Sequence, residues 1–516
     1  MLSMSARKST NRAEKGGRSA RRRARLEAPV EMLPPLEIAL PLYEPLNEEE
    51  VENLHDASMR ILEEIGIDFR DPEALEYWRQ ARADVEGNRV RIDRGLLMEL
   101  VSLAPERFVL SARNPDRDVP IGGRSMAFVP TYGSPFVLDF DNQRRYSTLD
   151  DLQAFHRLAY MSPSMHLTGG VTCEPVDVPV PKRHLHIVHS ALVNSDKPFM
   201  GATTARDRAE DTVAMAKIAF GEDFLEEHVV LTAVLSCNSP LVWDATMLDA
   251  LKVYAANNQA IIPSPFVMAG ASTPASMVGA VAQINAEALA GTAFAQLVRK
   301  GAPVIYGQFL ATVNMQSGAP MAGTPEISLM NFMIGQLARR YRLPWRSSGM
   351  TAGSKLADAQ AAYESSMTMQ SVLLSGANYV FHSAGWLEGG LMASFAKFVL
   401  DAEQMEMYHR FGSGIDMSDL DEAIAAMHEV GPSGHFLGTA HTLERFQTAF
   451  FAPKLLDNSS FEQWTIDGAQ DASQRALLRA RQMLESFEPP PLSESIDQAL
   501  KDYIAEREQE LPDDVS

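Results

Sequence analysis

The sequence predicts an α/β protein built on a TIM (β/α)8 barrel, with an N-terminal α+β cap and a C-terminal helical extension. Seven strand-then-helix units follow one another after Ser147, spaced roughly 31 to 43 residues apart. Most of these strands are apolar throughout, which is typical of parallel strands covered by helices. The sequence contains neither GxGxxG nor GxxxxGK[ST], so a nucleotide-binding doubly wound fold is not favoured.

The chain is expected to begin with a disordered tail at residues 1–28. This segment is basic, poor in large apolar side chains and without amphipathic order. A solvated tail or an over-extended start site would explain it. The functional alternative is a basic arm that docks on an acidic partner.

Residues 29–146 are expected to form the α+β cap. Asn47 and Glu50 resemble a capping box, and the apolar residues that follow lie on one helical face, which predicts a helix. Two shorter helices are expected, near residues 72–81 and 94–104. Residues 108–146 mix short apolar runs with Asn-Pro, Gly-Gly and Gly-Ser-Pro turns, which predicts antiparallel strands.

Residues 147–450 are expected to form the barrel. Helices between its strands have recognisable starts, such as Thr324 followed by Pro325. The eighth strand is expected near residues 434–438 (GHFLG), and residues 451–516 form the helical extension. The seven apolar runs predicted as strands lie at 165–170, 198–202, 229–236, 260–268, 303–311, 343–349 and 378–385.

Composition narrows the function further. The 516 residues carry a formal net charge of −21, which disfavours a general nucleic-acid binder or a partner of anionic membranes. Cys173 and Cys237 lie far apart without a CxxC motif, so neither a disulfide framework nor a thiolate zinc site is supported. No apolar run approaches the roughly 18 to 20 residues of a membrane span. We therefore expect a soluble, cytoplasmic protein. A large acidic barrel with a helical C-terminal extension is also expected to form a homo-oligomer.

In a TIM barrel the chemistry lies at the C-terminal ends of the strands. The side chains expected there are aromatic, amide or hydroxyl groups with few charges, and they include no histidine pair with a carboxylate third ligand. Three histidines cluster at 184–189 (HLHIVH), where helix packing or solvation is favoured over metal binding. No tightly bound metal is expected.

An aromatic pocket with few basic residues suits a quaternary ammonium group, because this cation binds chiefly to ring faces. Each aromatic side chain taken alone can also be explained as core packing, and only their convergence favours a site. His435 is a candidate for binding a carboxylate, and Tyr132 could either close the pocket from above or pack in the core or a turn. The substrate-binding candidates are Tyr132, Phe266, Phe309, Phe381, Trp386 and His435.

Three stretches of the chain resemble the trimethylamine methyltransferase (MttB) superfamily. They are residues 46–69 (LNEEEVENLHDASMRILEEIGIDF), 354–404 and 434–464, and the likeness covers nearly everything after residue 45. Members of that superfamily are TIM barrels that move a methyl group from a methylated amine to the Co(I) of a small corrinoid protein. The resemblance therefore implies a corrinoid carried by a separate partner protein.

One difference from the founding trimethylamine enzyme is informative. That enzyme carries pyrrolysine at a position that aligns near residues 349–351, where this chain has the ordinary residues GMT. The resemblance thus points to the branch without pyrrolysine, whose members demethylate quaternary amines such as glycine betaine, carnitine and proline betaine. A quaternary nitrogen leaves as a neutral amine, so the reaction needs no general acid.

The strand ends and the resemblance together suggest roles for individual residues. His382 could bind a substrate carboxylate, or it could only satisfy a neighbouring backbone group. Glu388 could pair with the ammonium or cap the following helix. The catalytic candidates are His382, Gln308 and Glu388. The candidates facing the corrinoid or its protein are Gly349, Lys355, Asp358, Tyr363 and Gly389.

The expected function is a corrinoid-dependent methyltransferase acting on a quaternary amine such as glycine betaine. The cobalt is expected on a separate protein because the chain lacks a DxHxxG cobalamin-binding motif. One alternative is a betaine-binding or regulatory barrel that kept the pocket and lost the transfer. Another, a lyase or hydrolase, would need a base and a metal or a Schiff-base lysine, for which Lys355 is the nearest candidate.

Overall fold

The computed structural model describes residues 32–513, and the tail expected at 1–28 lies outside these described residues. The described chain divides into two compact units. The larger comprises residues 32–417 and 473–513, and the smaller comprises 418–472. The expected cap and extension boundaries, at residues 146 and 450, stay a prediction.

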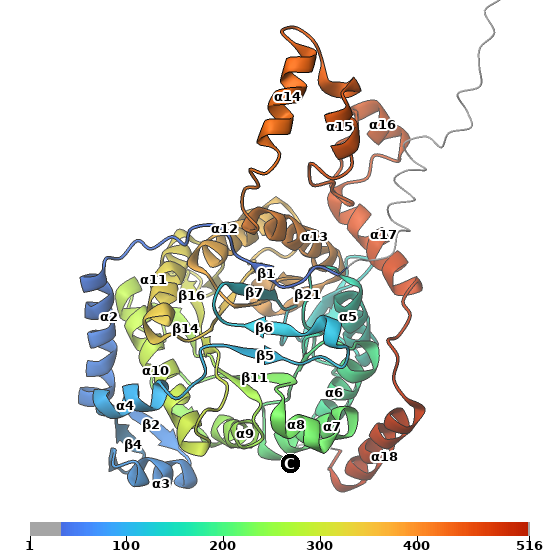
Figure 1. Ribbon diagram of the computed structural model, residues 1–516. Helices are drawn as coiled ribbons and strands as arrows, with labels where there is room; N and C mark the ends of the chain where they lie inside the picture. Colours follow the sequence, from blue (N-terminus) through green and yellow to red (C-terminus); the bar gives the residue numbers. More distant parts are fainter. Residues whose placement is uncertain (1–31, 514–516) are drawn as a thin grey trace, which may run out of the picture. The chain divides into compact units, whose positions relative to one another are not determined.

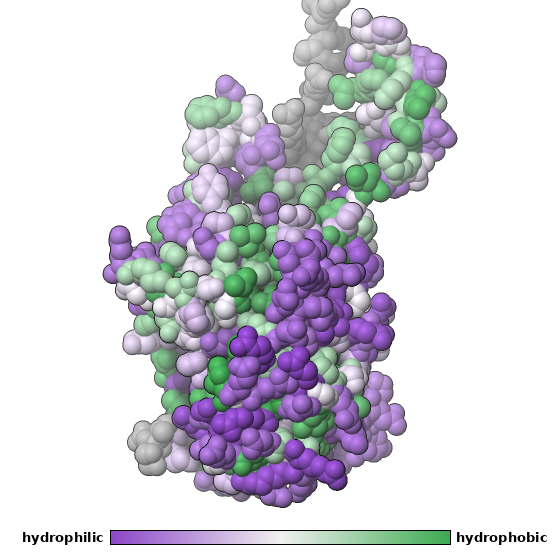
Figure 2. Space-filling view, turned by 90° about the vertical axis from the view of Figure 1, so that its left-hand side faces the viewer, coloured by the Kyte–Doolittle hydropathy of each residue, from purple (hydrophilic) through white to green (hydrophobic). Residues whose placement is uncertain are grey.

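The larger unit begins with short helices and a small sheet at one side. Helix α2 (Glu48–Arg60) starts at the predicted capping box, in which the Asn47 side chain accepts from the Glu50 amide at 3.0 Å. Its charged residues face outward and Leu54 is buried, which gives this side of the molecule a hydrophilic surface (Figure 2). The other elements here are β2 (Ile67–Arg70), α3 (Pro72–Gln80), β3 (Asp84–Glu86), β4 (Arg89–Arg91), α4 (Arg94–Val101) and β12 (Val242–Asp244).

Eight segments form a ring at the centre of the larger unit. Five pairs of neighbours are joined as parallel ladders. A parallel bridge between Ile261 and Val304 adds a sixth link, and backbone hydrogen bonds join segment 166–169 to both of its neighbours. The members are β7 (Ser125–Phe128), segment 166–169, β10 (Phe199–Met200), β11 (Leu231–Leu235), β13 (Ala260–Pro263), β15 (Tyr306–Gly307), β18 (Trp345–Ser348) and β19 (Tyr379–Phe381).

Apolar side chains fill the ring. Leu167, Met200, Ile262, Ile305 and Phe381 come from different segments and belong to one buried cluster. This packing explains why the strand sequences are apolar throughout instead of alternating.

A helix follows each ring segment before the next begins, and Figure 1 shows these helices around the outside of the strands. Each β-then-α unit therefore repeats the same local pattern, as the spacing of the apolar runs predicted. The helices are α5 (Leu149–Met161), α6 (Arg183–Asn194), α7 (Arg206–Phe220), α8 (Glu222–Glu227), α9 (Ala245–Ala256), α10 (Met277–Val298), α11 (Pro325–Tyr341), α12 (Ala359–Ser375) and α13 (Phe395–Gly412).

The expected eighth strand is wrong. Residues Phe436–Gly438 form a 3-10 helix, η4, in the smaller unit. The eighth place in the ring belongs to β7, which pairs in parallel with β19 and antiparallel with β1 (Leu36–Glu37). Residues 108–146 were predicted as antiparallel strands, because their short runs and turns say nothing about a partner about 250 residues away.

Further short strands lie at the two ends of the ring. Strand β14 runs parallel to β16, while β16 and β17 are antiparallel, and together they extend the wall beyond β13 and β15. These strands are β5 (Phe108–Leu110), β6 (Val119–Ile121), β8 (Phe136–Leu138), β9 (Arg144–Tyr146), β14 (Phe266–Ala269), β16 (Phe309–Val313), β17 (Pro320–Met321), β20 (Trp386–Leu387) and β21 (Met392–Ser394).

The C-terminal residues of the larger unit form α17 (Ala472–Glu485) and α18 (Glu494–Glu510). Helix α18 is anchored on α7 through Asp211, which accepts from the Tyr503 hydroxyl and from Arg507 Nε, each at 2.7 Å. Across residues 32–513, we find no helix with the length and apolar character that crossing a membrane would require.

The smaller unit consists of short helices with few buried side chains. Its helices are α14 (Leu420–Val430), α15 (Ala440–Arg445) and α16 (Phe461–Ile466), besides η4. Large apolar residues such as Leu437, Phe446 and Phe450 are exposed instead, so this unit has little core of its own.

Candidate active site

The loops that follow β15, β18 and β19 enclose a pocket at one end of the ring. Its empty volume, counted out to the solvent, is about 480 Å³. The lining found among residues 32–513 is apolar or neutral and polar, without a charged side chain. It consists of Phe266, Gln308, Phe309, Leu310, Ala311, Pro320, Met321, Ala322, Ile327, Asn331, Ser347, Ser348, Thr351, Thr368, Trp386 and Gly389.

An aromatic cluster stands between this pocket and the centre of the ring. Phe309 contacts Phe266 and Trp386, with ring centroids 4.9 and 5.7 Å apart. The His382 ring lies 4.1 Å from Trp386 and 4.3 Å from Phe381. The structure therefore brings together four of the predicted aromatic residues and the predicted histidine.

The aromatic residues differ in how far they are buried. Phe266 is 39% exposed at the pocket rim, whereas Phe381 is 1% exposed and belongs to the ring core. Tyr132 packs on Phe381 at 5.4 Å, and burial raises its pKa to about 12. The rings available to a ligand are thus those of Phe266, Phe309 and Trp386. Phe381 and Tyr132 pack behind them, on the side of the ring core.

His382 has an unusual backbone and a defined partner. Its φ of 55° lies in the left-handed region, which is uncommon for residues other than glycine and is found at functional sites. Burial, and then the charge of Arg346, hold its pKa well below the ordinary value, so the ring is neutral. Its Nε2 lies 3.2 Å from Arg346 Nη2. Because a guanidinium only donates, Nε2 accepts and the ring proton is on Nδ1.

Arg346 is the residue that the sequence analysis missed. It stands in β18, is 2% exposed, and donates to Ser264 Oγ at 3.1 Å and to the Gln308 backbone oxygen. Its Cζ lies 4.8 Å from the Phe381 ring centroid and 5.6 Å from that of Phe309. Burial lowers its pKa to about 9. An arginine inside a run predicted as a buried strand was the signal that could have found it.

Gln308 is held in the wall of the pocket. Its amide nitrogen donates to Asn331 Oδ1 and to Ser347 Oγ, each at 3.0 Å. Its Oε1 is buried and finds no donor among residues 32–513. The side chain therefore presents a fixed acceptor, and an amide has no acid or base function near neutral pH.

Several candidates have other structural roles. Glu388, predicted to be catalytic, forms an ion pair with Arg144 at 2.8 Å. Asp358 caps α12, and its hydrogen bond from the Ala361 amide lowers its pKa. The Lys355 ammonium is exposed and donates to the Gly353 carbonyl oxygen at 2.9 Å, and Tyr363 is 76% exposed.

The remaining predicted site residues are two glycines and His435. The Gly349 amide donates to the Phe381 carbonyl at 2.7 Å, which ties the end of β18 to β19. Gly389 lines the pocket with a φ of 64°, a conformation that favours glycine. His435 belongs to the smaller unit and is not among the lining residues.

A buried ion pair supports the two loops that carry the site. Lys397 on α13 donates to Asp401 at 2.7 Å and to the Met350 carbonyl at 3.0 Å. Asp401 also accepts from the Gly385 amide at 2.9 Å. The pair therefore links the loop after β18 to the loop after β19.

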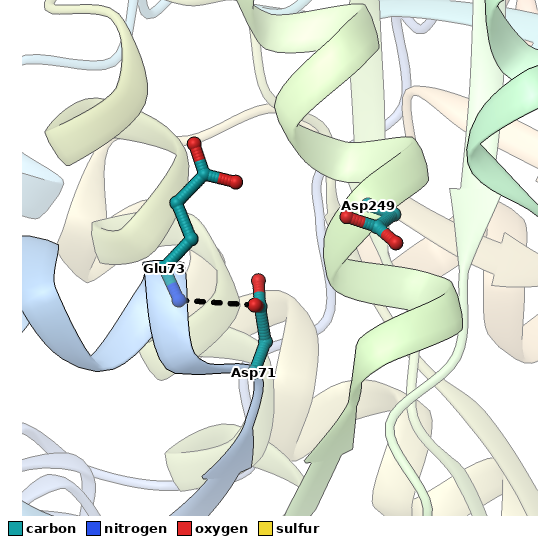
Figure 3. Close-up of side chains that lie close together, drawn as sticks. All are labelled: Asp71, Glu73 and Asp249. Carbon is teal, nitrogen blue, oxygen red and sulfur yellow. Dashed lines mark hydrogen bonds between the residues drawn. The ribbon is translucent and has the colours of Figure 1, made fainter.

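Three carboxylates elsewhere lie close enough to suggest a metal site. Asp71 and Glu73 at the start of α3 approach Asp249 on α9 (Figure 3). The Lys252 ammonium lies 2.6, 2.5 and 3.0 Å from these three residues. A protein cation thus already neutralises the cluster, which gives it a structural explanation.

Comparison with known proteins identifies the relatives of the chain. The sequence model of the trimethylamine methyltransferase (MTTB) family matches residues 14–512. A glycine betaine methyltransferase of Desulfitobacterium hafniense is 41% identical over 473 residues, which cover 92% of this chain and 98% of the relative. A proline betaine:corrinoid methyltransferase of Eubacterium limosum is 29% identical, covering 89% and 96%.

A trimethylamine methyltransferase of Desulfitobacterium hafniense is 30% identical over 90% of this chain and 94% of its own length. Among solved structures, the monomethylamine methyltransferase of Methanosarcina barkeri aligns with a TM-score of 0.52 over 92% of this chain and 93% of its own. At 11% identity, that likeness supports a shared α/β fold alone.

Proposed function

The chain belongs to the trimethylamine methyltransferase family, and on this premise we propose that it transfers a methyl group from a quaternary amine to the Co(I) of a separate corrinoid protein. The observation that carries the proposal is the cluster of rings at the pocket. The 41% identical relative named glycine betaine methyltransferase supports a substrate of the betaine class.

The pocket suits a cation that cannot donate a hydrogen bond. The rings of Phe266, Phe309 and Trp386 offer faces to the methylated nitrogen, and no carboxylate from the described part of the chain lines the pocket. An ammonium with hydrogen-bonding protons would lose hydration there without finding an anion. A quaternary nitrogen has no such protons to satisfy, so its desolvation costs less.

The transfer breaks one N–CH3 bond, and its electron pair stays on nitrogen to give a neutral tertiary amine. The corrinoid, brought by its own protein as the second substrate, supplies Co(I), which accepts the methyl group. This leaving group needs no proton, so His382 and Gln308 have positioning roles in the proposal, while Glu388 holds its loop through the ion pair with Arg144. Exclusion of water by the aromatic rings favours a step in which charge is dispersed.

The residues at the pocket mouth are compatible with a large planar partner. The pocket opens to solvent, and its lining includes the small residues Ala311, Ala322 and Gly389. We propose that Gly349 and Gly389 let the macrocycle approach. The exposed Lys355 and Tyr363 would then contact the corrinoid protein, with Asp358 fixing the helix beside them.

Membership of this family also bears on the architecture of the larger unit. We infer that the ring of eight segments, each followed by a helix, is a TIM barrel, with residues 29–146 and 451–516 as its cap and extension. Active sites of that fold lie at the C-terminal strand ends. The pocket residues Gln308, Ser348 and Gly389, which end or follow ring strands, fit this rule.

We also propose that the protein is a homo-oligomer that uses the smaller unit. Eight large apolar side chains between residues 420 and 450 are at least 40% exposed. They are Leu420, Ile424, Met427, Phe436, Leu437, Leu443, Phe446 and Phe450. A surface of this kind is typical of homodimer interfaces. Analytical ultracentrifugation of the wild type and a Phe446→Ser/Phe450→Ser variant tests it, and an unchanged monomer in both would contradict it.

The methyl transfer is tested with the purified chain, a reduced corrinoid protein and a panel of quaternary amines. Formation of the methyl-cobalt absorbance with glycine betaine or a related betaine is expected. Heat-denatured enzyme and a panel lacking methyl donors are the controls. Calorimetric binding of a betaine without any transfer would instead favour a binding or regulatory protein, and absence of both would reject the proposal.

A further inference from the structure

A second cavity lies at the N-terminal ends of the ring strands. Its empty volume, counted out to the solvent, is about 530 Å³. His166 lines it where segment 166–169 begins, and Lys197 lines it just before β10. Residues 32–35 and 116–119 provide most of the remaining lining. Because the ring strands are parallel and the candidate active site follows their C-terminal ends, the two cavities lie at opposite ends of the ring.

The floor of this cavity carries positive charge with little compensation. Lys197 is 3% exposed, and its ammonium donates to the neutral carbonyl groups of Ala159 and Met165 at 2.8 and 2.6 Å. Within residues 32–513 no carboxylate forms an ion pair with it. Arg117 lies beside it and pairs through Nε with Asp196 at 3.1 Å. In the described part of the chain, two cations therefore share the charge of one carboxylate.

Two N–H groups of the lining residues lack acceptors. The Nδ1 atom of His166 accepts from the Phe128 amide at 2.8 Å, so the ring proton is on Nε2. This Nε2 and Arg117 Nη1 are buried, and neither meets an aligned acceptor among residues 32–513. Buried donors without acceptors are uncommon, because each has lost its hydrogen bonds to water. A ligand with two acceptor oxygens and a negative charge would satisfy both.

The open side of the cavity carries the opposite charge. Asp116 is exposed and Asp118 is half-buried, whereas His166 and Lys197 are buried. Asp118 Oδ1 accepts from the Ala112 amide at 2.8 Å. No lysine, arginine or histidine of the described chain forms an ion pair with either aspartate. The cavity is therefore polarised, with donors and positive charge on its floor and acceptors and negative charge at its rim.

We propose that this cavity binds a free α-amino acid, whose carboxylate accepts from Arg117 and His166 and whose ammonium group donates to Asp116 and Asp118. A plain carboxylate would satisfy the floor alone, and a plain amine the rim alone. A quaternary ammonium group has no N–H for the rim. This site is separate from the pocket in which we place the methyl transfer, so the assignment does not depend on the proposed function.

The test is isothermal titration calorimetry of the full-length protein with glycine, acetate and methylamine. Glycine should bind roughly fivefold or more tightly than either ligand that carries a single charge. Arg117→Met should weaken glycine binding by roughly 10- to 150-fold, the usual range for a hydrogen bond to a charged group. Asp116→Asn should weaken glycine binding by roughly two- to fivefold without weakening acetate binding. Asp223→Asn, at another exposed aspartate, is the matched control.

Hydrogen exchange locates the bound ligand. Glycine should slow the exchange of the amides at residues 116–119 and leave the loops after β18 and β19 unchanged. The assignment would be overturned by an absence of glycine binding, by equal affinities for glycine and acetate, or by protection confined to those two loops. The comparison of ligands and the Asp116→Asn variant decide the outcome even if Arg117→Met fails to fold.

Discussion

Replacing Lys397 by methionine should destabilise the protein by about 3–5 kcal/mol, the usual cost of breaking a buried ion pair. The side chains of Lys397 and Asp401 are 3% and 6% exposed. Besides this ion pair, the ammonium bonds Ser365 Oγ and the Met350 carbonyl, each at 3.0 Å. Methionine keeps much of the volume of the aliphatic part of the lysine side chain. The loss of stability therefore reports the contribution of the charge and its hydrogen bonds.

The free energy converts to a melting temperature. The unfolding entropy is about 2.1 cal/mol/K per residue, which gives about 1.1 kcal/mol/K for 516 residues. If the chain unfolds in one transition, differential scanning calorimetry should show Lys397→Met melting about 3–5 °C below the wild type. Lys501→Met is the matched control, because Lys501 pairs with Asp497 at 2.6 Å on an exposed helix and should shift stability by less than about 1 kcal/mol.

The pH dependence identifies the cause. Burial raises the pKa of Asp401 to about 6 despite the neighbouring Lys397, so its ionisation costs stability as the pH rises from about 4 to 6. Without Lys397 the carboxyl binds a proton still more readily. The loss of unfolding free energy caused by Lys397→Met should therefore be smaller at pH 6 than at pH 8. The double variant Lys397→Met/Asp401→Asn should recover part of this loss. A deficit that is absent, or equal at both pH values, would refute this reasoning.

Three further predictions follow from the same structure. Trp386→Leu should raise the KM for a quaternary amine roughly 5- to 30-fold, because a ring face for the cation is lost, as steady-state kinetics would show. Gln308→Leu should cost about 1–3 kcal/mol in a urea titration, because the buried Asn331 oxygen loses one of its two donors and the buried Ser347 hydroxyl loses the hydrogen bond from Gln308. The pKa of Asp211 is about 2 because hydrogen bonds from His184, Arg507 and Tyr503 outweigh its burial, so the docking of α18 should weaken as the pH falls from about 4 to 2. Hydrogen exchange of α18 checks this, and Asp211→Asn should exchange faster at neutral pH.

Local patterns in the sequence were enough to predict most of the repeating architecture. The seven apolar runs coincide with β10, β11, β13, β15, β18, β19 and the segment 166–169. The capping box at Asn47 is also confirmed. Each of these features depends on neighbours a few residues away, which is the range that periodicity and capping rules describe.

The pairing partner of β7 lay beyond that range. Its run SMAF is short and sits among turn signals, so composition favoured a hairpin, whereas its parallel pairing with β19 depends on how the whole ring closes. The same limit applied to GHFLG, whose glycines and histidine suit a turn as well as a strand end. Its own apolar residues, Phe436 and Leu437, are exposed, which a buried ring strand would not allow.

The gathering of aromatic side chains at one place could be predicted from residue type alone. Aromatic residues at successive strand ends indicated a cation pocket, and Phe266, Phe309, Trp386 and His382 do converge. Glu388 was assigned a catalytic role because nothing in the sequence shows that Arg144, from a distant strand, neutralises it. Arg346 was overlooked because it lies in a mostly apolar run. A single charged residue does not change the prediction of such a run as a buried strand.

The pairing of β7 with β19 has a consequence for synthesis. Tyr379 aligns with Ala127, so the ring lacks its closing pair until nearly three-quarters of the polypeptide has been made. Until then both edges of the growing sheet expose unpaired amide and carbonyl groups, which favour association with other chains. A nascent chain stalled before residue 379 should therefore be protease-sensitive and prone to aggregate, and release of the full-length product should restore protection.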